Sequence, residues 1–96
     1  MKEAIKSLWD LVYQAFEQTS HHGIEVGLAM SPDKHEVQHH LLHSVSTLKI
    51  AGAEERAMLC NQIRADVMLC QAKGWFSNDI TDGAMDLLDQ IQDARD

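Results

Sequence analysis

The sequence predicts an all-α protein, a compact bundle of about four helices that forms a single domain over residues 1–96. A length of 96 residues suits one domain, since independent folding units usually contain about 100–150 residues. Hydrophobic residues make up 45% of the chain and charged residues 24%, which is typical of a folded globule and not of a disordered tail. Apolar residues also recur every three or four positions through four segments, which is the period of an amphipathic helix.

The first helix is expected over residues 3–20. Its apolar residues lie on one helical face, and they are Ile5, Leu8, Trp9, Val12, Ala15 and Phe16. Because glycine commonly follows the last turn of a helix, Gly23 is expected at the end of this helix or just beyond it. Residues 24–30 are expected to form a loop or an isolated helical turn, since the chain offers no second strand for them to pair with.

The second helix is expected over residues 32–51. Its start signal is Ser31, Pro32 and Asp33, a capping hydroxyl followed by a proline at the first helical position and an acid in the first turn. The stripe expected to be buried contains Val37, Leu41, Val45 and Leu48. Gly52 is expected to end this helix.

The third and fourth helices are expected over residues 54–73 and 78–94, with Gly74 ending the third. The apolar stripe of the fourth helix contains Ile80, Ala84, Leu87, Leu88 and Ile91. Between the two helices, Trp75 and Phe76 are expected either to cover the end of the bundle or to anchor a partner protein. None of these helices can bury its apolar face alone, so the four are expected to pack together.

The third helix differs from the others because it has two apolar faces. One face contains Leu59, Cys60, Ile63, Val67 and Cys70, and the other contains Met58, Ala65, Leu69 and Ala72. Two apolar faces need two partners. Either this helix is the central helix of the monomer, or its second face is covered by another subunit, as in a homodimer, or by a target protein.

Cys60 and Cys70 lie ten residues apart on this predicted helix, a separation of about 15 Å. A disulfide needs Cα atoms within about 7 Å, so the two cysteines are not expected to bridge each other. We expect both to act as small hydrophobic core residues, and reduced thiols fit a cytoplasmic protein.

The net charge of −7 favours a protein partner with a basic surface and disfavours direct binding to nucleic acid. The chain contains no run of 18 apolar residues, so no membrane segment is expected. Its N-terminus lacks the apolar core of a secretory signal, and the expected location is therefore the cytoplasm.

The last helix carries a row of aspartates at helical spacing: Asp79, Asp82, Asp86, Asp89, Asp93 and Asp96. Residues 79–96 contain these six acids and one arginine, so they hold −5 of the net charge of −7. The row projects opposite to the apolar stripe of the same helix. Like charges at this spacing cost about a few tenths of a kcal/mol per pair, so fold stability does not account for them. The row is interpreted either as a solvated face or as a docking surface for a basic partner.

The second helix carries a cluster of histidines. His35, Glu36 and His39 match the HExxH pattern, in which two imidazoles hold zinc and the glutamate activates water. The extended pattern with a third ligand is absent, so no metal ligands and no cofactor are predicted. His35, His39 and His43 are expected to be exposed near Ile50. The residues His35, His39, His43, Ile50, Trp75 and Phe76 are therefore candidates for a second interface.

No arrangement of residues in the sequence predicts catalysis, so we expect a protein that is not an enzyme and has no catalytic residues. The leading prediction is a small acidic module that binds and regulates or inhibits a larger, basic-surfaced macromolecule through the aspartate row. A nucleic-acid-processing or defence enzyme is the sharpest version of that target. Two alternatives are a metal-binding protein or HExxH hydrolase that uses the histidine cluster, and a structural subunit of a helical oligomer.

Overall fold

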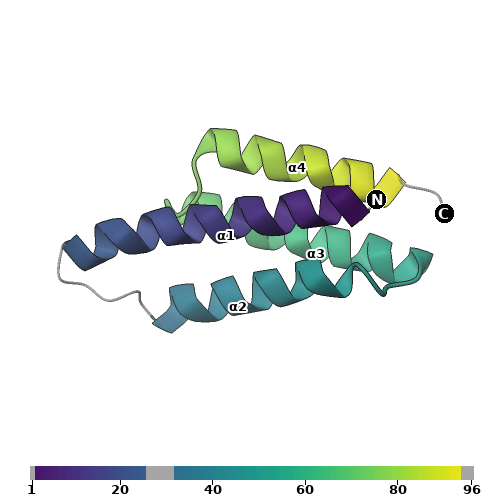
Figure 1. Cartoon of the computed structure of the whole chain (residues 1–96), viewed down its shortest axis with the longest axis horizontal. Helices are drawn as coiled ribbons and strands as arrows, with labels where there is room; N and C mark the ends of the chain where they lie inside the picture. The colour runs from purple at the N-terminus through teal and green to yellow at the C-terminus, as the bar shows by residue number, and fades with distance from the viewer. Residues whose placement is uncertain (1, 26–31, 94–96) are drawn as a thin grey trace.

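The structure, a computed structural model, describes the backbone of residues 2–25 and 32–93 and the side chains of residues 2–17 and 34–93. This part of the chain contains no strand and forms four helices, α1 (Lys2–Glu25), α2 (Pro32–Thr47), α3 (Ala53–Ala72) and α4 (Asn78–Asp93). The predicted all-α class is confirmed (Figure 1).

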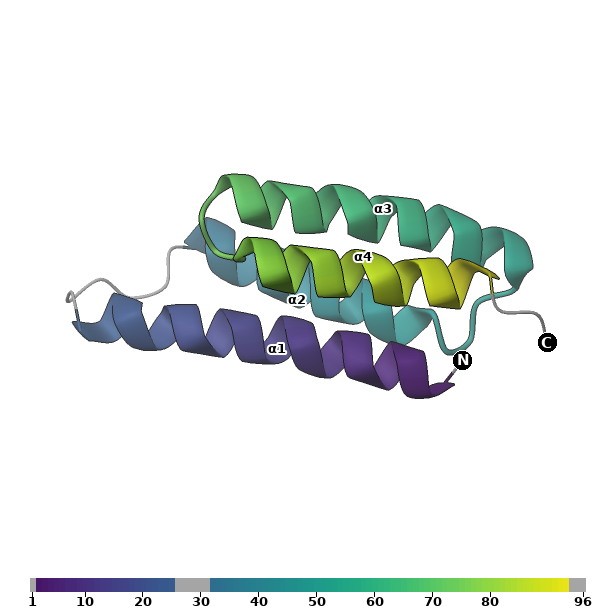
Figure 2. The same cartoon turned by 90° about the horizontal axis from the view of Figure 1, so that it is seen from above.

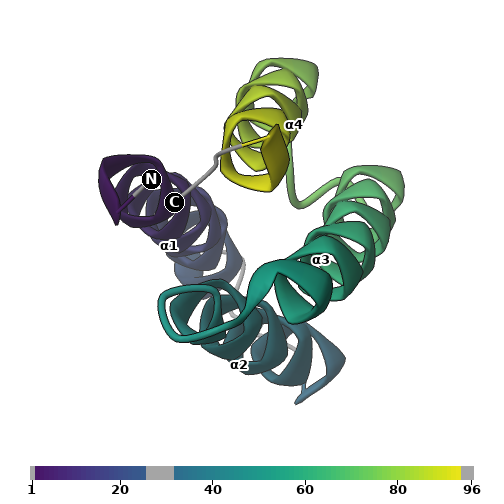
Figure 3. The ribbon, with the colours of Figure 1, turned by 90° about the vertical axis from the view of Figure 1, so that its right-hand side faces the viewer.

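The four helices form a ring around one core. Successive helices run in opposite directions along the long axis of a molecule that measures 47 × 23 × 20 Å. α1 contacts α2 and α4, and α3 contacts the same two helices from the other side. Seen along the axis, α1 therefore lies across the ring from α3 (Figure 3). From above, α4 lies between α1 and α3 (Figure 2).

The core is built from the apolar stripe of each helix. Its fully buried side chains include Ile5, Leu8, Val12 and Phe16 from α1, Leu41 and Val45 from α2, Cys60, Ile63, Val67 and Cys70 from α3, and Ala84, Leu88 and Ile91 from α4. These are the residues that the helical period predicts to face inward. Removing such side chains from water is the main favourable term in folding.

The structure contradicts the interpretation of α3 as the central helix of the monomer. In a ring of four helices each helix has two neighbours, and α3 contacts only α2 and α4. The described part of the chain therefore leaves the second apolar face of α3 uncovered, with Met58 and Leu69 exposed.

α2 is shorter than predicted, because it ends at Thr47 and not at residue 51. The Thr47 hydroxyl donates a hydrogen bond to the carbonyl of His43. The next three residues form tighter turns, since the N–H groups of residues 48–50 donate to carbonyls three residues earlier. Gly52, expected to end α2, instead has extended backbone and is the residue that precedes the first turn of α3.

α1 is longer than predicted. It continues through Gly23 to Glu25, so the expectation that Gly23 ends this helix or follows its end is wrong. Ile24 and Glu25 belong to α1 and form neither a loop nor a separate helical turn. Glycine inside a helix costs only about 1 kcal/mol relative to alanine, which weakens a helix without terminating it. The remainder of the expected loop and the predicted cap Ser31 lie outside the described residues.

Gly74 ends α3 as predicted, and it does so with a specific motif. Its φ of +80° lies in the left-handed region. The N–H of Gly74 donates to the carbonyl of Gln71, and the N–H of Trp75 donates to the carbonyl of Cys70. This pair of bonds is the Schellman motif, which satisfies two of the last carbonyls of a helix. The turn carries Trp75 and Phe76 onto the end of the bundle, where Phe76 is buried with its ring centroid 5.1 Å from that of Phe16.

We expect Gly74→Ala to lower the free energy of unfolding by about 1 kcal/mol, because a Cβ is disfavoured at positive φ. No other atom lies within 4 Å of the position that this Cβ would take, so the effect isolates backbone strain. Gly74→Asn is the matched control and should lose less, since asparagine adopts this conformation more readily than alanine. Urea unfolding measures both variants, and equal losses would contradict the assignment.

Candidate protein-binding surfaces

The aspartate row lies on the outer face of α4. Ser77 caps this helix, since its Oγ accepts a hydrogen bond from the N–H of Ile80. The buried face of α4 consists of Thr81, Ala84, Leu88 and Ile91. The opposite face carries the five aspartates that the structure describes, and all are exposed: Asp79, Asp82, Asp86, Asp89 and Asp93. We call these five residues the acidic stripe; the sixth predicted member, Asp96, lies outside the described residues.

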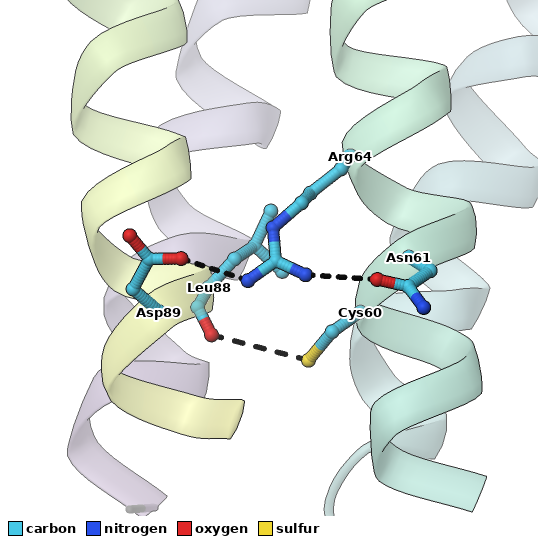
Figure 4. A network of polar contacts seen from close by, with 5 residues as sticks. All are labelled: Cys60, Asn61, Arg64, Leu88 and Asp89. Atoms are coloured by element: carbon cyan, nitrogen blue, oxygen red, sulfur yellow. Dashed lines mark hydrogen bonds and ion pairs between the residues drawn. The ribbon is translucent and has the colours of Figure 1, made fainter. Parts of the chain in front are cut away.

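One member of the acidic stripe is paired with a base of its own chain. Arg64 of α3 donates from Nη2 to Oδ1 of Asp89 at 2.8 Å and from Nη1 to Oδ1 of Asn61 at 3.0 Å (Figure 4). Beneath this contact, Sγ of Cys60 lies 4.0 Å from the carbonyl oxygen of Leu88. Arg64 therefore joins the outer edges of α3 and α4. Within the described side chains, the other four aspartates of the stripe form no ion pair.

The predicted exposure of the histidines agrees with the structure, because His35, His39 and His43 all lie on the outer face of α2. The rings of His35 and His39 meet edge to face, with centroids 4.6 Å apart. His40 points instead toward α3, where its Nε2 lies 3.5 Å from Oδ2 of Asp66. Among the described residues, no three histidine, cysteine or carboxylate side chains converge in a way that could hold a metal ion.

The residues predicted as a second interface do not form one surface. Ile50 is 86% exposed in the turn between α2 and α3, whereas Trp75 and Phe76 lie in the connection at the other end of the bundle (Figure 1). Phe76 is buried against Phe16 and so cannot anchor a partner. Trp75 is half-buried, with the Lys34 ammonium 5.9 Å from the centre of its ring. The aromatic pair covers the end of the bundle, the first of its two predicted roles.

The thiols are buried as predicted. Cys60 and Cys70 are free cysteines with fully buried side chains. Burial raises the pKa of Cys70 to about 12, and the nearby Asp66 adds to the rise. Burial also raises the pKa of Cys60. Because the thiolate is the reactive form, neither side chain is suited to act as a nucleophile at neutral pH.

The sequence did not reveal a basic groove between α1 and α2. Lys2, Lys6 and Lys49 line an open hollow of about 470 Å³. Beside it, the rings of Trp9 and Tyr13 stack with centroids 5.2 Å apart. No sequence pattern could indicate this groove, because the third lysine comes from a helix end more than forty residues away. Three of the eight bases of the chain therefore meet in one hollow.

Comparisons with protein-family models, with curated proteins and with solved structures found no match to this chain. Over residues 2–25 and 32–93, none of the helices combines the length and the apolar character that a membrane crossing requires. The function must therefore be argued from the surfaces of the bundle.

The Asp66 carboxyl makes the stability of the protein depend on pH. Burial raises the pKa of this carboxyl above its ordinary value of 3.8, and His40 offsets part of the rise. The folded state therefore favours the protonated acid, so this group's contribution to stability falls as pH rises from 3.8 through the raised pKa. We expect Asp66→Asn to stabilise the protein more at pH 7 than at pH 3, as measured by urea unfolding of both proteins at each pH.

The control is the same substitution in a chain that carries His40→Gln. Without the imidazole, the ionised Asp66 loses its favourable neighbour, and the gain from Asp66→Asn at pH 5 should increase. A gain that is identical at pH 3 and pH 7 would show that ionisation of this carboxyl does not affect folding.

Proposed function

We propose that this protein is a small acidic interaction module that binds and regulates or inhibits a larger, basic-surfaced macromolecule through α4. The observation that carries the proposal is the acidic stripe, in which four of the five described aspartates are exposed and form no ion pair with any side chain of residues 2–17 and 34–93. Their charge is available to a partner. The sharpest form of the proposal is an inhibitor of a nucleic-acid-processing or defence enzyme, whose arginines and lysines the stripe would occupy.

The spacing of the stripe supports a protein partner. From Asp79 to Asp93 the carboxylates span about 21 Å of helix, an average of about one charge per 5 Å. The helix holds this array rigidly, because its opposite face is anchored in the core by Leu88 and Ile91. A fixed row of charges speeds association with an oppositely charged surface and selects against partners of like charge. Nucleic acid is a partner of like charge.

The acidic stripe lowers the stability of the folded protein. Neighbouring aspartates one turn apart repel each other, and acids such as Asp89 and Asp93 near the C-terminus of a helix oppose its dipole. Arg64 relieves this repulsion only at Asp89. Stability does not explain the other charges, which supports a role for them in binding.

The test compares two variants with the same net charge. One carries Asp82→Asn, Asp86→Asn and Asp93→Asn, and leaves Asp79 in place because an acid is favourable in the first turn of a helix. The matched control replaces the same number of acids on other helices, also outside the first turn, with glutamine, at Asp10, Glu17 and Glu36. The wild-type protein and both variants are immobilised and used to capture proteins from a cell extract at about 0.05 M and about 0.5 M salt.

We expect the wild type and the glutamine control to capture the same basic protein at low salt. The α4 variant should capture at least tenfold less of that protein. High salt should release it from every bait, since the contact is electrostatic. Equal loss from both variants would show that net charge alone is responsible. Capture that is insensitive to salt would place the interface elsewhere.

A further inference from the structure

The outer face of α3 carries a continuous row of exposed residues. These are Glu54, Met58, Gln62, Ala65, Leu69 and Lys73, at spacings of 4, 4, 3, 4 and 4, and we call them the outer row of α3. Residues three or four apart are neighbours on a helix, so the row forms a single stripe. All six side chains are exposed, and Met58 and Gln62 lie on the side of α3 toward the end of α2, since they line a hollow together with Thr47.

The outer row exposes apolar side chains that a monomer gains nothing by presenting to water. Met58 is 63% exposed and Leu69 is 42% exposed, and Met68 beside the row is 52% exposed. A hollow of about 210 Å³ lies next to Met58, between α3 and the end of α2, and is lined also by Thr47, Glu55, Leu59 and Gln62. Exposed apolar side chains that share one helical face mark an interaction site more often than exposed residues scattered singly do.

The order of residues in the outer row identifies the partner. Read forward, the row is Glu, Met, Gln, Ala, Leu and Lys, with an acid at one end, a base at the other and large apolar residues beside each. When a second copy of α3 lies antiparallel, Glu54 faces Lys73 of the second copy, Met58 faces Leu69 of the second copy, and Gln62 faces Ala65 of the second copy. A parallel arrangement would place Glu54 opposite Glu54 and Lys73 opposite Lys73. Charge therefore selects the antiparallel pairing.

We propose that the protein forms a symmetric homodimer through antiparallel contact of the outer row of α3, with the two-fold axis midway between Gln62 and Ala65. Each residue pair occurs twice, as a two-fold interface requires. The small side chain of Ala65 lets the helices approach closely near the axis, and Leu69 of the second copy meets the hollow beside Met58. Glu54 and Lys73 lie about 28 Å apart at the two ends.

The dimer has a consequence that rests on the function proposed above. The two-fold axis is perpendicular to α3 and lies in the plane of the interface. Rotation about this axis does not change a position measured along it. A helix that lies on one side of α3 along the axis therefore lies on the same side in the second copy. α4 is the neighbour on one side of α3 and α2 is the neighbour on the other (Figure 3). Both acidic stripes therefore lie on the same face of the dimer, which would present a basic partner with two charged helices.

The test uses two single charge reversals, Glu54→Lys and Lys73→Glu. Each alone places like charges at both ends of the antiparallel interface, which should weaken the homodimer about tenfold. When the two chains are mixed, every end again joins a base to an acid, so a heterodimer should form with an affinity within about threefold of wild type. Sedimentation equilibrium of each chain and of the mixture measures these affinities.

The matched control pair carries Glu36→Lys and Lys2→Glu, at exposed positions of α2 and α1. These two chains have the same net charges as the test pair but leave the outer row unchanged, so each should form a homodimer by itself. Leu69→Asp should abolish dimerisation in any background, and circular dichroism of this variant reports whether the bundle stays folded.

Three outcomes would overturn the proposal. They are a wild-type chain that stays monomeric throughout the concentration range, test chains that form homodimers as well as the controls do, and a test mixture that does not associate. The acidic-stripe variant with Asp82→Asn, Asp86→Asn and Asp93→Asn should dimerise normally. A failure of the dimer is thus distinguishable from a failure of partner binding through α4.

Discussion

The structure depends on contact between the four apolar stripes around one narrow core. Each helix has two neighbours, so it buries one face and exposes the other. The deepest side chains, among them Phe16, Ile63 and Leu88, come from different helices and are fully buried. Close packing of such side chains fixes how each helix is rotated about its axis. That rotation determines which residues reach the surface, and the surfaces proposed for binding follow from it.

The outer faces that remain are chemically different from one another. α4 presents carboxylates, α3 presents methionine and leucine, and α2 presents histidines. The hollow between α1 and the turn after α2 brings together Lys2, Lys6 and Lys49. Arg64 reaches from α3 to Asp89 of the acidic stripe.

The two interfaces proposed for this bundle rest on different physics. The acidic stripe acts over a distance, and its strength depends on salt because exposed charges are screened. The outer row of α3 acts at contact, since removal of Met58 and Leu69 from water supplies the free energy and its end charges select the orientation. Both surfaces expose groups that lower the stability or solubility of an isolated monomer, which is the physical reason to assign them to binding.

The fold class, the inward stripes and the outward direction of the aspartates and of His35 were predictable from the amino-acid sequence, because the helical period assigns each residue to a face without knowledge of its neighbours. It could not determine that α3 lies at an edge of a ring and not at a centre, since this depends on how four stripes pack. Nor could it assign Phe76 to the core, join Arg64 to Asp89 or gather Lys2 with Lys49. These relations link residues far apart in the chain, and only the packing of the helices brings them together.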